Sequence, residues 1–100
     1  MPLEVRRTHA ADRDLYEIWL YVRVNNAPAA DQLLRRISER FALLAQNPLL
    51  GRSRPELGEA LRSFYAEGYA IFYRHTDTTL SITRVLSHYR DATKQVFPER

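Results

Sequence analysis

The sequence contains no cysteine, which excludes a disulfide framework and a thiolate metal site. It also has no apolar run that approaches the roughly 20 residues of a membrane-spanning helix. Its three histidines lie far apart without a recurring spacing, which argues against a metal site. The chain passes directly into patterned sequence after its first methionine. We therefore expect a cytoplasmic protein without a signal peptide, a membrane association or a cofactor.

The motifs of common enzyme classes are missing as well. We find no P-loop, no dinucleotide-binding fingerprint, no nucleophile elbow and no paired-carboxylate motif. Arginine, histidine and tyrosine are therefore the residue types from which a small enzyme of this sequence would have to build its site.

Lysine is nearly absent, because Lys94 is the single lysine among 15 basic residues. This bias reflects either the codon usage of a GC-rich genome or the suitability of arginine for binding phosphate and carboxylate groups. The net charge is +3, and neither end of the chain forms a basic tail. Any site for an anion must therefore be assembled by folding.

The composition is that of a globular protein, with 45% hydrophobic and 27% charged residues. A chain of 100 residues seldom supports two separate cores. We therefore expect residues 1–100 to form a single domain.

The first half of the sequence has the periodicity of two amphipathic helices. Thr8 is suited to cap the first helix, and Asn25-Asn26 to end it. The second helix is expected from Pro28 to about Gln46. Because the link between the helices is short, they should form an antiparallel hairpin.

The remaining segments are predicted to form a sheet, because apolar and polar residues alternate or short turns separate apolar runs. The predicted strands are residues 3–7, 61–66, 69–75 and 79–86. Residues 48–60 are expected to form a loop, and residues 89–97 a short final helix. The last three strands form an antiparallel meander because their turns are short. The fold class is therefore α+β, in the order β-α-α-β-β-β(-α), with a helical hairpin packed on one face of a small antiparallel sheet.

This arrangement identifies the side chains expected in the core. They are Leu15, Ile18, Trp19, Val22, Leu34, Ile37, Phe41, Leu44, Ile71 and Tyr73. In the last strand, Arg84 interrupts an apolar stripe of Leu80, Ile82 and Leu86, which should share one face of the sheet.

Six segments, in this order along the chain, resemble the RelE/ParE toxin family. They are residues 10–19 (AADRDLYEIW), 47–52 (NPLLGR), 54–57 (RPEL), 61–63 (LRS), 69–74 (YAIFYR) and 83–91 (TRVLSHYRD). The resemblance spans residues 3–97, and the order of elements matches. One departure is Ser87-His88, which stands where the family pattern has His-Gly or His-x.

The resemblance implies the toxin of a type II toxin–antitoxin module, with the helices on one face of the sheet and a shallow concave surface on the other. It implies neutralisation by a small cognate antitoxin, expected to be ParD-like with a ribbon-helix-helix fold. A segment of the antitoxin would wrap the helical hairpin and a sheet edge. Any contact with DNA would then pass through the antitoxin.

The family has two branches that act differently. ParE-like members poison DNA gyrase by binding, whereas RelE-like members cleave mRNA on the ribosome. This sequence has no tyrosine after Tyr89 and almost no lysine, and both features favour the ParE-like branch. A degenerate member that serves mainly in the autoregulatory antitoxin complex is a third interpretation.

The residues expected to bind the target are mainly arginines near the strand ends. They are Arg62, Arg74, Arg84, His88 and Arg90. Gathered on one side of the sheet, they would suit phosphate or an acidic protein surface. Alternatively, the arginines are scattered and solvated, and Arg84 forms a salt bridge to Asp91 or Glu67.

The residues expected to bind the antitoxin lie on the first helix. They are Tyr16, Trp19, Leu20 and Arg23. Tyr16 lies off the apolar stripe, and tyrosine is favoured at interfaces. Trp19 has the alternative role of a core residue against the second helix. No catalytic residue is predicted; the only candidates for proton transfer are His75, His88 and Tyr89.

Overall fold

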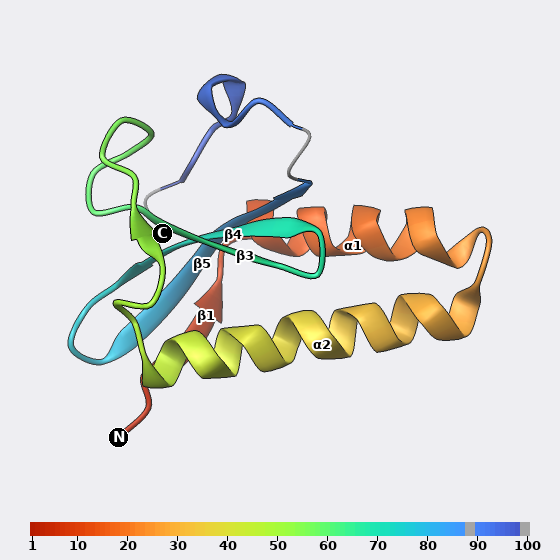
Figure 1. Ribbon diagram of the computed structural model, residues 1–100, viewed down its shortest axis with the longest axis horizontal. Helices are drawn as coiled ribbons and strands as arrows, with labels where there is room; N and C mark the ends of the chain where they lie inside the picture. The colour runs from red at the N-terminus through yellow and green to blue at the C-terminus, as the bar shows by residue number, and fades with distance from the viewer. Residues whose placement is uncertain (88–89, 99–100) are drawn as a thin grey trace.

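The computed structural model describes residues 1–87 and 90–98 and confirms the expected α+β class (Figure 1). The elements are β1 (Glu4–Arg7), α1 (His9–Arg23), α2 (Ala27–Gln46), β2 (Arg52–Ser53), β3 (Arg62–Ala66), β4 (Tyr69–His75), β5 (Thr79–Ser87) and the 3-10 turn η1 (Ala92–Lys94). Most bounds lie within one or two residues of those predicted. The final helix is shorter than expected and consists of this 3-10 turn. Within the described ranges, no helix is long and apolar enough to cross a membrane.

The five strands form one mixed sheet in the order β1-β5-β4-β3-β2. The expectation of a wholly antiparallel sheet is wrong for β1, which pairs in parallel with β5, with Val5 opposite Leu80. A parallel pair requires a long crossover, and the two helices with the following hairpin provide it. The short β2 lies inside the segment predicted as loop and pairs antiparallel with β3.

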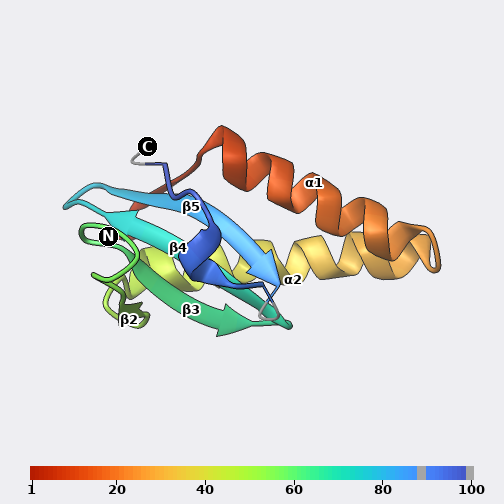
Figure 2. The same ribbon diagram turned by 90° about the horizontal axis from the view of Figure 1, so that it is seen from above.

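The two helices begin at side-chain caps and form the predicted hairpin (Figure 2). The Thr8 hydroxyl accepts a hydrogen bond from the Ala11 amide, and the Asn26 side chain accepts one from the Ala29 amide. Pro28 lies in the first turn of α2, where its missing N–H carries no penalty. Side chains of both helices meet the same face of the sheet in one core cluster.

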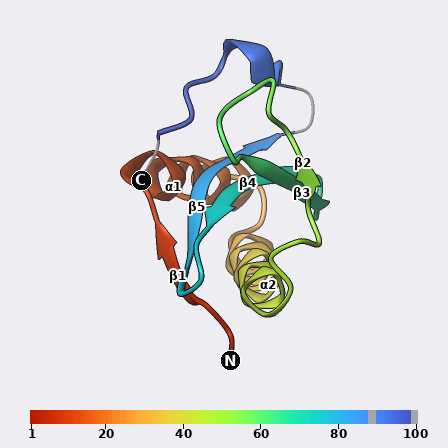
Figure 3. The same cartoon turned by 90° about the vertical axis from the view of Figure 1, so that its left-hand side faces the viewer.

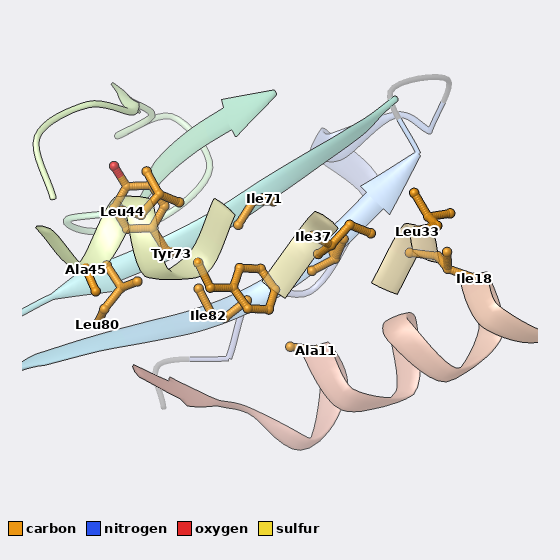
Figure 4. Packing of buried hydrophobic residues seen from close by; sticks show 12 residues of the cluster. Ala11, Ile18, Leu33, Ile37, Leu44, Ala45, Ile71, Tyr73, Leu80 and Ile82 are labelled. Atoms are coloured by element: carbon orange, nitrogen blue, oxygen red, sulfur yellow. The ribbon is translucent and has the colours of Figure 1, made fainter. Parts of the chain in front are cut away.

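This main core contains most of the side chains expected there (Figure 4). Ile18, Ile37, Phe41, Leu44, Ile71 and Tyr73 are buried, as predicted. Leu15, Trp19, Val22 and Leu34 are only partly buried. Leu33 of α2 is also buried, although it was not among the predicted core residues. The centre of the buried face of α2 therefore lies nearer Leu33 than the periodicity suggested.

The face of the sheet away from the helices carries a second apolar cluster. Its buried members are Leu61, Ala70, Phe72 and Leu86, and Leu57, Ala92 and Phe97 pack against them. The Phe72 and Phe97 ring centroids are 4.7 Å apart. Figure 3 shows the segment before β3 and the C-terminal segment on one side of the sheet, with α2 on the other. The centre of this far face is thus covered by chain segments, whereas the resemblance implied a shallow concave surface there.

A β-bulge in β5 divides the stripe that was expected to share one face. Phe72 pairs with Arg84 whereas the adjacent Tyr73 pairs with Ile82, so Thr83 is an extra residue. Before the bulge, Leu80 and Ile82 face the helices; after it, Leu86 faces the far cluster. The prediction of one continuous face was wrong because it assumed an uninterrupted two-residue period.

Candidate functional site

Arg84 forms a nearly buried salt bridge to Asp14 of α1. Its Nε lies 2.7 Å from Asp14 Oδ2, and its Nη2 lies 2.9 Å from Oδ1. The two side chains are 13% and 4% exposed. The hydrogen bonds that Arg84 donates to Asp14 raise the pKa of Arg84 above its ordinary value. The predicted salt bridge therefore exists, but its partner is Asp14 and not Asp91 or Glu67.

The same pair also binds two backbone groups. Asp14 Oδ2 accepts a hydrogen bond of 3.0 Å from the Val85 amide, and Arg84 Nη1 donates one of 2.9 Å to the Val96 carbonyl. The pairing of β1 with β5 ends at Ile82, so the Val85 amide lies beyond the end of β1. Asp14 supplies the acceptor that a neighbouring strand would otherwise provide. Arg84 thus joins α1, β5 and the C-terminal segment.

Arg74 and Arg62 also bind backbone carbonyls. Arg74 donates to the Glu59 carbonyl at 2.8 Å and to the Pro98 carbonyl at 2.6 Å, while Arg62 donates to the Gly51 carbonyl at 2.6 Å. Arg74 alternates with the core residue Tyr73 and faces away from the helices. Arg62 pairs with Tyr73 and so lies on the helix side.

The five residues predicted to bind the target are therefore only partly brought together. Arg74 and Arg84 share the far face of the sheet, whereas Arg62 lies on the opposite face. Arg90 is exposed beyond the end of β5. His88 lies outside the described residues.

Arg54 lies on the far face, although its segment was predicted only as a loop. Its Nε donates to Glu56 at 2.8 Å, and its Nη1 donates to the Ser63 hydroxyl at 3.2 Å. Its guanidinium carbon lies 6.0 Å from the centroid of the Phe72 ring. The hydrogen bond that Arg54 donates to Glu56 raises the pKa of Arg54; burial lowers it, and a hydrogen bond with the exposed Tyr65 raises it further. The short β2, which pairs with β3 just before Arg54, brings Arg54 over the sheet. This two-residue strand was not predicted from the sequence, and so neither was the position of Arg54.

The four residues predicted to bind the antitoxin form one continuous surface on α1. The Tyr16 and Trp19 rings are stacked with centroids 6.2 Å apart, and the Arg23 guanidinium lies 5.0 Å from the Trp19 ring. Tyr16 is 59% exposed and Leu20 is 38% exposed. Trp19 also donates a 2.9 Å hydrogen bond to Asp31 of α2, so it contributes to the hairpin as well as to this surface.

A hollow lies beside this surface. Tyr21 of α1 and Val24, which caps the end of the helix, are exposed as well, but they lie outside this surface and were not among the predicted contact residues. The hollow, of about 280 Å³, lies between the two helices. Its lining is mostly apolar and comprises Arg7, Asp12, Leu15, Leu34, Ile37, Ser38 and Phe41. We call Tyr16, Trp19, Leu20 and Arg23, together with this hollow, the helical surface.

Two of the groups that could transfer protons, Tyr73 and His75, are poorly placed for chemistry on the far face. The Tyr73 hydroxyl donates to the Pro48 carbonyl at 2.7 Å and accepts from the Gly51 amide at 2.8 Å. Burial raises the pKa of Tyr73, and its ring belongs to the main core. His75 is half-buried at the end of β4. Tyr89 lies outside the described residues.

Comparison with known proteins places this chain among bacterial toxins. Residues 5–92 match the family of ParE toxins of the type II toxin–antitoxin system parDE. Toxin ParE3 of Caulobacter vibrioides is 34% identical over 83 residues, which cover 82% of this chain and 83% of that protein.

Two solved structures share the fold. A chain of the chromosomal ParDE system of P. aeruginosa superposes with a TM-score of 0.72 at 23% identity, covering 85% of this chain and 95% of that one. A chain of the toxin–antitoxin complex RelBE2 of Mycobacterium tuberculosis superposes with a TM-score of 0.61 at 29% identity, covering 88% and 100%.

Proposed function

Since the chain belongs to the ParE toxin family of type II toxin–antitoxin systems, we propose that it inhibits DNA gyrase by binding and without catalysis. The proposal further holds that a ParD-like antitoxin neutralises the toxin at the helical surface. The family assignment supports the first part, and the exposed aromatic and aliphatic side chains of α1 support the second.

One observation carries the preference for binding over catalysis. A ribonuclease needs a general base near the ribose 2′-hydroxyl and an acid near the leaving oxygen, both at hydrogen-bond distance. The centre of the far face instead holds Leu61, Ala70, Phe72 and Leu86. These apolar side chains can act neither as a general base nor as a general acid. Arg74 and Arg84 flank this cluster, but their guanidinium groups bind the chain itself and stay protonated.

One feature favours the alternative, a ribosome-dependent endoribonuclease. Tyr65 is 60% exposed on β3 and interacts with Arg54. A phenol beside a guanidinium group is the described pair best suited to proton transfer and phosphate binding at this edge of the far face. A ribonuclease of this chain would therefore depend on Tyr65, in addition to any contribution from His88.

The experiment that separates the two activities is induction of the toxin in a bacterial host. We expect filamentation and a DNA-damage response, while mapped mRNA ends show no new translation-dependent cuts. Cuts within codons that disappear in Tyr65→Phe or His88→Ala variants, without a DNA-damage response, would overturn the proposal in favour of the ribonuclease.

The antitoxin part has its own test. The product of the adjacent upstream reading frame should restore growth when co-expressed and should co-purify with the toxin. Restored growth without a physical complex would contradict neutralisation by direct binding.

A further inference from the structure

Three adjacent strands place two arginines and one serine in a row across the far face of the sheet. Arg6 of β1 pairs with Ser81 of β5, and Ser81 pairs with Arg74 of β4. Paired residues point to the same side of a sheet, and neighbouring strands are about 4.8 Å apart. The Ser81 hydroxyl therefore lies midway between two guanidinium-bearing side chains.

This row forms the floor of a groove of about 880 Å³ beside the apolar cluster of the far face. Its remaining lining residues are Arg7, residues 57–60, His75, Thr76, Thr79 and Phe97. Arg7 lines both this groove and the hollow of the helical surface, but the groove is otherwise separate from that surface, because α1 and α2 pack against the other face of the sheet.

Donor groups on this floor are available to a ligand. Arg74 uses Nε and Nη1 for backbone carbonyls, while Nη2 forms no hydrogen bond with the described residues and lies close to Gly58, where an added Cβ would be 2.8 Å from it. Among the described residues, none forms a hydrogen bond with the Ser81 hydroxyl. Arg6 pairs with Glu4 at 2.9 Å, but both side chains are more than half exposed. Such a surface pair contributes little and gives way readily to a stronger anion.

We propose that this groove binds the phosphate group of a nucleotide, either free or within a single strand. Arg6 and Arg74 donate from the two flanks of the row and Ser81 from its centre. Donors in these three directions suit a tetrahedral anion better than a planar carboxylate, which favours two parallel donors from one guanidinium group. Glu4 pairs with Arg6, and Glu59 lines the groove. Their negative charges partly offset the positive charge of the arginines, so we expect the groove to bind one or two phosphate groups and no more. The apolar walls formed by Leu57 and Phe97 offer a surface against which a base can stack. This inference does not depend on the proposed inhibition of gyrase.

The test is binding of fluorescent ATP and of a labelled ten-nucleotide oligothymidylate to the purified full-length chain, with pyrophosphate as competitor. We expect both probes to bind and pyrophosphate to displace them. The ratio of the two affinities then tells whether the groove prefers a free nucleotide or a strand. Binding should weaken with rising salt, because phosphate contacts release counterions.

Three variants locate the site. Ser81→Ala and Arg6→Gln should each weaken binding by about ten- to a hundredfold, as expected for the loss of one hydrogen bond to a charged group. Gly58→Ala should also weaken binding, because the added methyl group displaces Arg74 Nη2 while the charge stays unchanged. Arg35→Gln, an exposed arginine of α2, is the matched control and should bind like wild type.

Several results would overturn the inference. One is the absence of binding by both probes at low salt. Another is an equal loss of affinity in Arg35→Gln and Arg6→Gln, which would indicate attraction by net charge alone. A third is tighter binding of a pentaglutamate peptide that pyrophosphate does not displace, which would identify the groove as a site for acidic peptides.

Discussion

Arg84 joins three segments of the chain through one guanidinium group. It binds the carboxylate of Asp14 in α1 and the carbonyl of Val96, while Asp14 also binds the Val85 amide. The sequence identified Arg84 as unusual because it interrupts an apolar strand. It did not identify Asp14 as the partner, because that contact spans 70 positions and depends on where β1 ends.

The contact between Arg84 and Asp14 provides a prediction on stability. Arg84→Ala should lower the free energy of unfolding by about 3–5 kcal/mol, because it leaves the carboxylate of Asp14 buried without its partner. Chemical denaturation at neutral pH measures this change. The double variant Asp14→Ala/Arg84→Ala should lose less than the sum of the two single variants.

The exposed pair Arg6–Glu4 is the control for that measurement. Glu4→Ala should cost less than about 1 kcal/mol, as is usual for surface ion pairs. A similarly small loss for Arg84→Ala would show that the Asp14 contact does not hold α1 to β5.

At the scale of elements, the helices were predictable and the sheet was less so. The periodicity of apolar residues and the caps at Thr8 and Asn26 define α1 and α2 from local sequence alone. The parallel pairing of β1, the bulge at Thr83 and the short β2 all depend on partners distant in sequence. Periodicity within one segment carries no information about such partners.

The packing of α2 on the sheet gives the second prediction. Phe41 is buried in the main core, and Phe41→Ala should lower the free energy of unfolding by about 3–5 kcal/mol through lost contacts and a cavity. The exposed Arg35→Ala on the same helix is the control, with an expected change within about 0.5 kcal/mol. Denaturant unfolding of both variants checks the assignment. A loss below about 1 kcal/mol for Phe41→Ala would mean that the buried face of α2 is misassigned.

The exposed surface of α1 gives the third prediction. Leu20→Glu places a charge among Tyr16, Trp19 and Arg23 without disturbing the core, so it should weaken antitoxin binding at least about tenfold, as for an interface anchor. Thermal unfolding of the free toxin should change little. Calorimetric titration with the purified antitoxin measures the affinity.

Tyr65→Glu is the matched control for Leu20→Glu. It also changes an exposed hydrophobic residue, but on the far side of the sheet from α1. Equal affinities of wild type and Leu20→Glu, or an equal loss in both variants, would be incompatible with an antitoxin site on the helical surface.

For the whole molecule, the two faces of the sheet have different roles. One face carries the helices and their exposed outer surface, and the other carries a small covered cluster flanked by arginines. The ordered family motifs gave the fold class and the toxin family, and both are confirmed. The covering of the far face was not predictable, because it depends on how residues 54–60 and 92–98 return over the sheet.

The most direct test of the account is supercoiling by purified DNA gyrase, titrated with the toxin and then with its antitoxin. We predict that wild-type toxin and Leu20→Glu both inhibit supercoiling, and that reversal of the inhibition requires at least about tenfold more antitoxin for Leu20→Glu than for wild type. Full gyrase activity at saturating, folded toxin, together with cleavage of ribosome-bound mRNA by the same preparation, would contradict it.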